Sequence, residues 1–264
     1  MKLIAVGKTD TGIVRSNNED SFIVDEKRGL LVVADGMGGH AAGEVASKLA
    51  ISIISGHLLD PNKFFGEYNK SYSPSTNNLN SALRLANLAV FEAAEGSPQL
   101  HGMGTTVAAV VICGNRLSIA HIGDSRVYLV RSGNIEQLTD DHSVVNEQVK
   151  RDLITREEAA SSTTKNYLTK AMGISAEMEA DLSEMTLLAG DILLLCTDGL
   201  SNMITDKIMM EIILSAKEPA AICDLLIKTA NTNGGKDNIT AVIGFIKKKS
   251  WYSTLFNYMA SLWR

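Results

Sequence analysis

The stretch Leu31-Val-Val-Ala-Asp35-Gly36-Met-Gly38-Gly39-His40 begins with four apolar residues, which are followed by one acidic residue and a glycine-rich turn. Ala41-Ala-Gly43-Glu44 follows it and begins a helix-like run. This order predicts a buried strand that brings the Asp35 carboxylate to the edge of a sheet, where glycines let the backbone approach closely. Asp-Gly after a strand is also ordinary turn chemistry, so a turn residue is the simpler interpretation of Asp35 alone.

Three further aspartates stand at the ends of apolar segments. One apolar strand ends in Asp198-Gly199, another ends in Gly123-Asp124, and the last strand begins after Asp237-Asn238. Carboxylates at several strand ends, without a Cys/His cluster, favour a shared oxygen-ligand site for a hard divalent cation. In a site of two ions ~3.5–4 Å apart, Asp35 is placed to bridge, Asp198 and Asp237 to ligate, and Gly36 to add a carbonyl oxygen.

A polar loop with Arg15, Glu19 and Asp20 precedes this stretch. An arginine guanidinium can hold a phosphate through two parallel hydrogen bonds, and the two acids can complete the water shell of a metal. More often, residues of these types at this spacing form only a solvated loop with a surface ion pair. Asp124 in Gly-Asp-Ser-Arg is equally compatible with a metal ligand and a hairpin-turn residue. His40 invites a general-acid role, although a histidine at the mouth of a helix is more often structural.

The bulk composition describes a soluble globular protein. Of the 264 residues, 45% are hydrophobic and 21% charged, and the formal net charge of −5 argues against nucleic-acid binding. Cys113, Cys196 and Cys223 are odd in number and widely spaced, which favours free thiols in a reducing compartment. The N-terminal residues lack the apolar segment of a secretory signal, and no apolar run reaches membrane-spanning length. We therefore expect a cytoplasmic protein.

Hydrophobic periodicity predicts an α+β chain in which helices cover an antiparallel sheet or sandwich. The helices are expected at 43–59, from about 79 onward, at 206–216 and at 220–229, and the strands at 3–6, 22–25, 30–34, 105–113, 117–122, 127–131, 135–138, 182–187, 192–196 and 239–246. Hairpin turns at 114–115 and 132–134 predict that the four strands from 105 to 138 form one antiparallel meander. Residues 62–78 are expected to form a loop. Residues 140–167, with the capping-box pattern Thr155-Arg-Glu-Glu158, are expected to form an inserted helical flap.

Taken in chain order, these motifs resemble those of the type 2C metal-dependent protein phosphatases, the PPM family. Gly12-Ile-Val-Arg15-Ser-Asn-Asn-Glu19-Asp20 is similar to the first motif, and Asp35-Gly-Met-Gly-Gly-His40 with Gly43-Glu44 to the second. The later motifs follow in the family's order as Gly104-Thr-Thr, Gly123-Asp-Ser-Arg126, Asp198-Gly199 and Gly235-Lys-Asp237-Asn238. The resemblance spans residues 7–246, and the second motif has the form found in bacterial members.

The resemblance implies a central antiparallel β-sandwich flanked on both sides by helix pairs, with two Mn²⁺ or Mg²⁺ ions at one end. It implies hydrolysis of phosphoserine and phosphothreonine in proteins by metal-activated water, without a phospho-enzyme. The expected partners are phosphorylated proteins and a bacterial Ser/Thr kinase that the phosphatase opposes. The expected oligomeric state is a monomer.

The resemblance also assigns roles by position. It places six residues at the two-metal centre: Asp35 as the bridge, Gly36 through its carbonyl, Asp198 and Asp237 on one ion, and Glu19 and Asp20 in support of the other. Arg15 corresponds to the residue that binds the phosphate. Asp124 matches the ligand of a third, weaker metal of bacterial members, with Ser161 of the flap as a companion.

One position departs from the family pattern. Some members carry a histidine directly after the Asp-Gly pair, where it is assigned as the general acid, whereas this chain has Met37. His40 stands three residues further on and is not equivalent. The hypothesis that follows is that water at the metal centre donates the proton, and a His40→Ala variant that keeps its metal but loses most turnover would overturn it.

A change in composition separates an expected phosphatase domain, 1–247, from a basic tail, 248–264. Trp251, Leu255, Tyr258, Met259 and Leu262 form a stripe at helical spacing behind three lysines, with no acidic residue. Such a helix can lie on an anionic membrane or contact a partner. Packing against the protein's own surface is at least as compatible with the pattern.

Two other functions remain open from the sequence. A catalytically silent phosphoprotein-binding module on the same fold is disfavoured, because every expected ligand position keeps its acid. A phosphoesterase for small-molecule phosphates would use the same metal chemistry. The 61–78 loop and the 140–167 flap do not distinguish protein substrates from metabolites.

Overall fold

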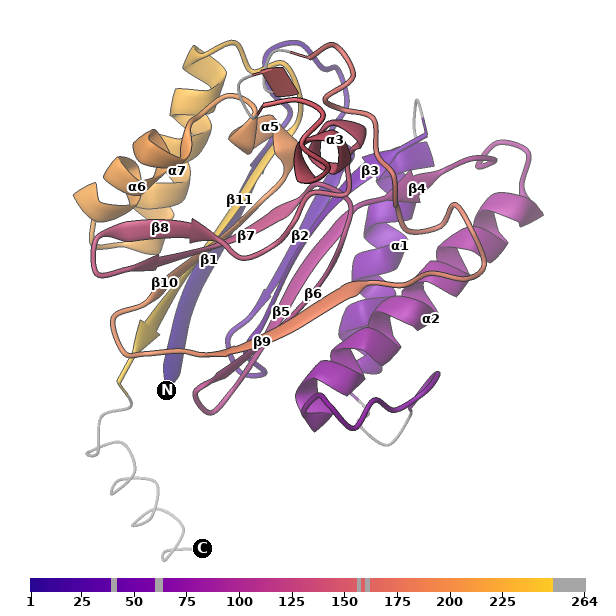
Figure 1. Ribbon diagram of the computed structural model, residues 1–264, viewed down its shortest axis with the longest axis horizontal. Helices are drawn as coiled ribbons and strands as arrows, with labels where there is room; N and C mark the ends of the chain where they lie inside the picture. Colours follow the sequence, from indigo (N-terminus) through magenta and orange to yellow (C-terminus); the bar gives the residue numbers. More distant parts are fainter. Residues whose placement is uncertain (39–41, 60–63, 156–157, 160–161, 249–264) are drawn as a thin grey trace, which may run out of the picture.

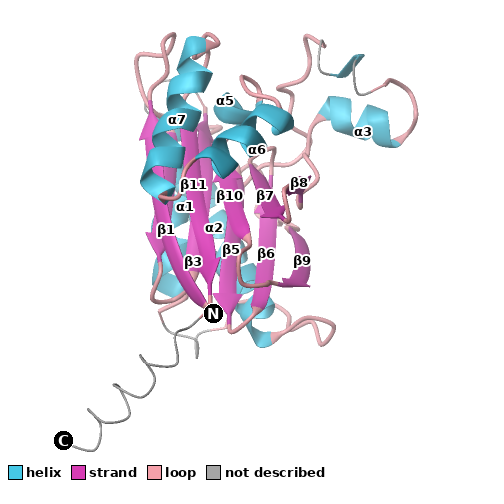
Figure 2. Cartoon of the chain, turned by 90° about the vertical axis from the view of Figure 1, so that its left-hand side faces the viewer, coloured by secondary structure: helices cyan, strands magenta, loops and turns pink. Residues whose placement is uncertain are grey.

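The computed structural model describes residues 1–38, 42–59, 64–155, 158–159 and 162–248. Two antiparallel sheets pack face to face, and helices cover the outer face of each sheet (Figure 1 and Figure 2). This arrangement is the α+β sandwich that the motifs imply. The stripe of the expected tail, from Trp251 onward, lies outside the described residues. In the described part of the chain, no helix has the length and apolar character needed to span a membrane.

Each sheet mixes strands from distant parts of the chain. The first sheet contains, in spatial order, β1 (Lys2–Asp10), β11 (Ile239–Lys247), β10 (Ile192–Cys196), β7 (Arg126–Arg131) and β8 (Asn134–Gln137). The second contains β2 (Asp20–Asp25), β3 (Leu30–Met37), β5 (Val107–Cys113), β6 (Arg116–Ile122) and β9 (Asp181–Thr186), with the short β4 (Gly104–Thr105) paired to β3.

The helices lie in pairs on the two outer faces. Helices α1 (Ala42–His57) and α2 (Pro74–Gly96) cover the second sheet, whereas α6 (Asp206–Ser215) and α7 (Pro219–Thr232) cover the first (Figure 1). Two shorter helices, α3 (Val144–Lys150) and α5 (Asp198–Ser201), lie near one end of the sandwich (Figure 2).

Strand β3 shows why the opening stretch is continuously apolar. Leu31 and Val33 pack between the two sheets, while Val32 and Ala34 pack against α1 and α2. Successive side chains of a strand point to opposite faces, and both faces of β3 are covered, so every position from 31 to 34 must be apolar. The packing on both faces fixes the position of this run in the sandwich, and Asp35 follows directly after it.

The prediction of one antiparallel meander is wrong. The strands from 105 to 138 do not form one meander, because β5 and β6 belong to the second sheet while β7 and β8 belong to the first. The chain crosses between the sheets at 123–125, where Gly123 has a φ of +101° and approaches Thr106 so closely that a Cβ would lie 2.5 Å from its Cγ2. Hairpin turns are local signals, whereas this crossing depends on tertiary packing.

The predicted loop at 62–78 ends too late. Helix α2 begins at Pro74, and Ser73 is its N-cap, accepting a hydrogen bond from the Thr76 amide at 3.4 Å. A capping serine followed by proline is a favourable helix start, and the high polarity of this segment concealed it.

The flap prediction is supported by its caps. Ser143 caps α3, and the Thr155 amide donates to a Glu158 carboxylate oxygen at 2.7 Å. The Glu158 amide donates in return to Thr155 Oγ1 at 3.2 Å, which completes the predicted capping box.

Candidate metal centre

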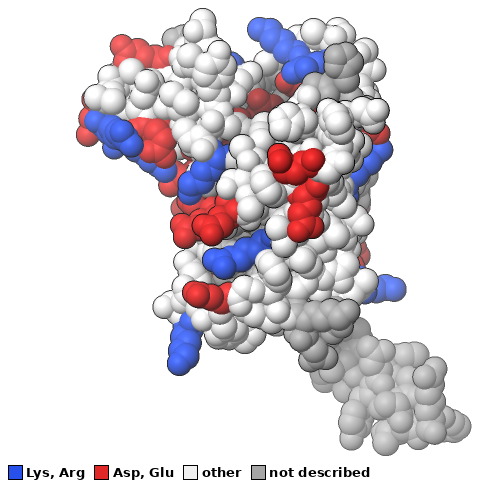
Figure 3. Space-filling model, turned by 90° about the vertical axis from the view of Figure 1, so that its right-hand side faces the viewer, with Lys and Arg blue, Asp and Glu red and all other residues white. Residues whose placement is uncertain are grey.

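A cleft of about 800 Å³ opens at the end of the sandwich beside the flap. Its lining contains seven of the eight predicted site residues: Arg15, Glu19, Asp35, Gly36, Asp124, Asp198 and Asp237. Acidic atoms are visible inside the hollow between the flap and the body of the molecule (Figure 3). The structure therefore brings together residues that lie up to 222 positions apart in the chain, such as Arg15 and Asp237.

Both sheets contribute to this cleft. Asp35 ends the apolar part of β3 in the second sheet and lies opposite Asp20 in the β2–β3 register. Asp198 follows β10 as the first residue of α5, and Asp237 precedes β11, so both belong to the first sheet's edge. The packing of one sheet on the other thus sets the distances between the carboxylates.

The backbone on both sides of Asp35 is held by two threonines. The Asp35 amide donates to Thr106 Oγ1 at 3.1 Å, and its carbonyl accepts from the Thr106 amide and from Thr105 Oγ1, both at 2.8 Å. A Cβ on Gly36 would lie 2.0 Å from the Gly43 carbonyl oxygen, so the start of α1 can approach only a glycine. The Asp35-Gly36 pair is therefore rigidly placed.

Arg15 lies beside Asp237 at the mouth of the cleft. Its NH2 group donates to Asp237 Oδ2 at 2.8 Å, and this hydrogen bond raises the pKa of the guanidinium. The Arg15 side chain remains 55% exposed, so it can also reach a ligand. The loop is anchored because the Ile13 and Val14 amides both donate to the Gly235 carbonyl, at 2.8 and 3.2 Å.

Asp20 lies behind the lining of the cleft. It is only 6% exposed, and its Oδ2 accepts hydrogen bonds from Thr197 Oγ1 at 2.8 Å and Thr240 Oγ1 at 2.6 Å. Through these contacts Asp20 holds the strand ends that carry Asp198 and Asp237. Asp20 therefore acts on the site through Thr197 and Thr240, and the support of the second ion that the resemblance assigns to it stays a prediction.

The carboxylates are buried and repel one another. Burial, together with nearby carboxylates, raises the pKa of Asp20 to about 7 and that of Asp198 to about 6. The same causes raise the pKa values of Asp35 and Asp124 well above the usual range for aspartate.

Two oxygens of the cluster also lack a hydrogen-bond partner. Among the described residues, the buried Oδ1 atoms of Asp20 and Asp198 accept no hydrogen bond. Bound divalent cations would remove the repulsion between the carboxylates and occupy unsatisfied oxygens. The donor set, which consists of carboxylates and a backbone carbonyl, therefore fits hard cations such as Mg²⁺ or Mn²⁺.

Asp124 connects the cleft with a second cavity under the flap. That cavity, of about 720 Å³, is also lined by Asp198 and by α3 residues including Val145 and Val149. Met37 lines the main cleft, and its thioether has no proton to donate. His40 and Ser161, the other residues considered for this site, lie outside the described residues.

Sequence reasoning missed residues that hold the site without carrying charge. Asn238 accepts from the Glu19 amide at 2.8 Å and donates to the carbonyls of Thr11 and Asn17 at 2.9 and 2.8 Å. It thereby shapes the whole Arg15 loop. In the sequence, Thr106 is recognisable only as the last residue of the Gly104-Thr-Thr motif. The motifs contained both residues, but their partners are visible only in the fold.

Comparisons with known proteins agree with this geometry. The sequence profile described as "Protein phosphatase 2C" matches residues 13–236. The chain is 41% identical over 236 residues to the serine/threonine protein phosphatase PstP of Mycobacterium tuberculosis, covering 89% of this chain and 43% of PstP. It is 36% identical over 240 residues to the serine/threonine phosphatase stp of Listeria innocua, covering 89% of this chain and 93% of that protein.

Solved structures show the same fold. The crystal structure of the M. tuberculosis phosphatase PstP/Ppp superposes with a TM-score of 0.85 at 39% identity, covering 94% of this chain and all of that one. A second structure, the PstP catalytic domain in complex with two manganese ions, has a TM-score of 0.82 at 39% identity, covering 94% and 99%. The chain belongs to the protein phosphatase 2C family. The fold and the family predicted from the motifs are both confirmed.

Proposed function

We propose that this chain is a metal-dependent protein phosphatase that hydrolyses phosphoserine and phosphothreonine. The observation that carries the proposal is the single cleft in which Asp35, Asp198, Asp237 and Asp124 converge beside Arg15. Buried carboxylates that repel one another need cations, and an arginine at the mouth of the cleft provides for a phosphate. The named activities of the PstP and stp relatives support the same conclusion.

The centre would hold two Mn²⁺ or Mg²⁺ ions, with a third bound more weakly. Asp35 would bridge the two, Gly36 would add its carbonyl, and Asp198 and Asp237 would ligate one ion, while Glu19 and Asp20 would support the other and Asp124 would hold the third. Bound there, the cations supply Lewis acidity to the phosphoryl oxygens and lower the pKa of a water molecule. The manganese complex of the PstP catalytic domain supports this choice of metal.

The chain's own residues bind and orient the phosphate. Arg15 uses one nitrogen to contact Asp237 and presents the remaining N–H groups to phosphate oxygens. Because Asp237 fixes the guanidinium, little side-chain entropy is lost when the phosphate binds. Met37 excludes a side-chain proton donor at the position where other members carry a histidine. We therefore propose that solvent at the centre protonates the leaving serine or threonine oxygen.

The biological setting is also a proposal. The substrates would be proteins phosphorylated by a cognate bacterial Ser/Thr kinase, in the cytoplasm, and the phosphatase domain, 1–247, would act as a monomer. The 248–264 tail would contact a membrane or a partner. Co-sedimentation with anionic liposomes that is unchanged after removal of residues 248–264 would exclude the membrane.

Phosphate release from a phosphothreonine peptide tests the activity. Mn²⁺ is titrated in and then chelated, with wild type, Asp198→Asn and the surface control Asp224→Asn measured side by side. We expect metal-dependent turnover that is lost in Asp198→Asn and kept in Asp224→Asn, because Asp224 lies on α7 and pairs with Lys8. Absence of turnover by folded wild type at saturating metal would favour a binding module. Faster turnover of free metabolite phosphates would favour a small-molecule phosphoesterase.

A further inference from the structure

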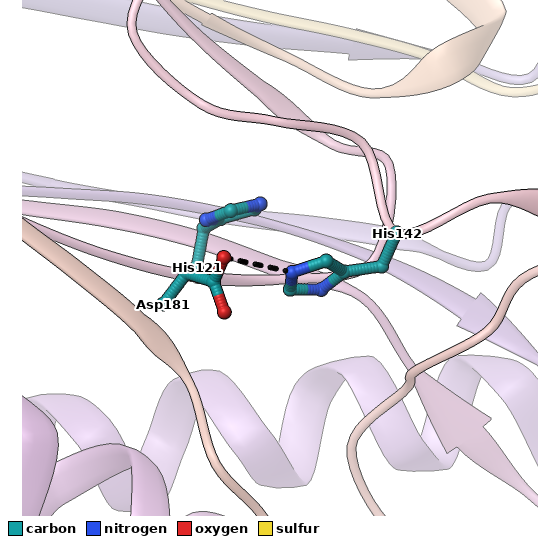
Figure 4. Close-up of side chains that lie close together, drawn as sticks. All are labelled: His121, His142 and Asp181. Atoms are coloured by element: carbon teal, nitrogen blue, oxygen red, sulfur yellow. Dashed lines mark ion pairs between the residues drawn. The ribbon is translucent and has the colours of Figure 1, made fainter. Parts of the chain in front are cut away.

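Two buried histidines and an aspartate gather next to the Asp124 turn. His121 lies on β6, His142 precedes α3, and Asp181 begins β9, and one ligand-type atom from each lies within 4.8 Å of the others (Figure 4). Both histidines are 3% exposed. Their rings stack with centroids 4.6 Å apart and planes 23° apart. Such a group can hold a metal ion, so its hydrogen bonds decide what it does.

The ring of His142 offers no lone pair to a metal in the tautomer that its surroundings favour. Its Nδ1 accepts from the Gly123 amide at 3.1 Å, so the ring proton of the neutral imidazole is on Nε2. The Nε2 atom lies 3.2 Å from Asp181 Oδ2, the contact drawn as a dashed line in Figure 4, and it has no hydrogen bond of good geometry within the described part of the chain. A metal at Nε2 would have to displace the ring proton while Nδ1 still faces a donor. The cluster is therefore built to orient the His142 ring.

His142 forms two hydrogen bonds with the backbone of Gly123. Its amide donates to the Gly123 carbonyl at 2.9 Å, and its ring accepts from the Gly123 amide at 3.1 Å. The next residue is Asp124. On the side of the turn opposite His142, Thr106 contacts Gly123. The Thr106 hydroxyl lies 2.7 Å from Ser125 Oγ. The Asp124 carboxylate is thus presented by a turn that is fixed on both flanks.

His142 also forms a hydrogen bond with the segment 166–171, which lines the catalytic cleft. The Thr169 amide donates to the His142 carbonyl at 2.8 Å, and Lys170 Nζ lies 3.1 Å from Asp181 Oδ1. His142 therefore joins the Asp124 turn to the segment against which a substrate would lie.

We propose that His142 is a positioning residue for Asp124, with its ring oriented by Asp181. Loss of the ring hydrogen bond to Gly123 lets the Asp124 turn rotate and weakens the binding of the metal that Asp124 holds. The two-ion centre built on Asp35, Asp198 and Asp237 keeps its ligands. The proposal rests on the proposed function, because it takes Asp124 as a metal ligand.

Direct counting of bound Mn²⁺ by equilibrium dialysis tests this proposal. Two substitutions at His142 separate its hydrogen bond to Gly123 from its contact with Asp181, because the Asn Oδ1 atom takes the place of the ring Nδ1 and the Gln Nε2 atom takes the place of the ring Nε2. His142→Gln keeps the donor toward Asp181 but loses the acceptor for Gly123. His142→Asn keeps that acceptor and is the matched control.

We expect His142→Gln to weaken the weakest Mn²⁺ about tenfold, the loss typical when an outer contact of a metal ligand is removed. His142→Asn should restore that affinity to within about threefold of wild type. Asp124→Ala should remove the same ion, and adding His142→Gln to it should change nothing further. Thermal unfolding of each variant shows that it is folded. If His142→Gln does not fold, Asp181→Ala releases the ring from its surface side and should weaken the same ion.

The results separate this proposal from the proposed function. If the weakest Mn²⁺ site has the same affinity in His142→Gln as in wild type, the positioning role is wrong. This conclusion does not depend on the result for Asp124→Ala. An Asp124→Ala variant that keeps every Mn²⁺ also overturns it, while the two-ion centre is tested independently by Asp198→Asn. An ion lost in His142→Gln and in His121→Ala, but kept in Asp124→Ala, would show that the histidines themselves bind metal.

Discussion

The contact between Gly36 and the start of α1 gives a sharp prediction for Gly36→Ala. The added Cβ would lie 2.0 Å from the Gly43 carbonyl oxygen and 2.8 Å from the Glu19 carbonyl oxygen. Both neighbours are backbone atoms, so no side chain can rotate away. The β3 end and α1 must separate by more than about 1 Å to restore an ordinary contact, which is overpacking of the costly kind.

The expected destabilisation is about 3 kcal/mol, at the upper end for overpacking. For a chain of this size, each kcal/mol shifts Tm by about 2–4 °C, so Gly36→Ala should lower Tm by about 6–12 °C. Differential scanning calorimetry in the presence of a chelator measures this effect on the protein alone. The Gly36 carbonyl moves with the strand, so the affinity for Mn²⁺ should fall as well.

Gly56→Ala, in the helix that Gly36 contacts, is the control. Gly56 is exposed near the end of α1, and a Cβ there would have no atom within 4 Å. Alanine is the better helix former, so this variant should gain about 0.5–1 kcal/mol. A Gly36→Ala protein with the Tm and Mn²⁺ affinity of wild type would refute the claim that this close approach fixes the site.

Three further predictions concern pH and stability. Without metal, the raised pKa values of Asp20 and Asp198, about 7 and about 6, mean that the folded state holds protons that the unfolded chain releases. The contribution of these two groups to the free energy of unfolding is therefore complete below about pH 4 and is lost as the pH rises toward 7. Because Mn²⁺ must displace the same protons, the stabilisation by Mn²⁺ in urea titrations should increase over that pH range. Arg126→Ala leaves the Asp141 carboxylate without its paired hydrogen bonds of 2.9 and 2.6 Å and should cost about 3 kcal/mol by urea unfolding. Ser73→Ala removes the cap of α2 and should cost about 1 kcal/mol in the same assay.

The sequence was informative about strands buried on both faces, and less so about where they pair. The apolar run at 31–34 and the run at 192–196 each predict a strand because both faces are covered in the fold. Strand β1 was predicted only over 3–6, yet it pairs with β11 from Lys2 to Asp10. Its polar end has no hydrophobic signal, and the pairing is supplied by a strand more than 200 residues later.

The charged part of the site was predictable because its acids recur after strands in a fixed order. Asp35, Asp198 and Asp237 were found in this way, and they meet in one cleft. Asn238 and His142 were given no role, because they act through hydrogen bonds to backbone groups that are remote in sequence. Such partners leave no pattern in a single chain.

Asp20 offers a test of how the two sheets cooperate, because it belongs to the second sheet and its partners belong to the first. Thr240→Val removes the hydroxyl that donates to Asp20 Oδ2 at 2.6 Å and preserves the side-chain shape. A hydrogen bond to a charged group contributes about 1.5–3 kcal/mol, so we expect a loss of that size at pH 8, where Asp20 is ionised. At pH 5, below the raised pKa of Asp20, the loss should be smaller.

The Mn²⁺ affinity of Thr240→Val should fall too, although no proposed ligand has changed. Thr197→Val is the partner variant, since its hydroxyl donates to the same oxygen at 2.8 Å. If the two effects arise from one shared carboxylate, the double variant should lose less than the sum of the single losses. Unchanged metal affinity in both single variants would show that Asp20 only stabilises the sandwich. In that case the distance between the sheets at this end would not control the metal centre.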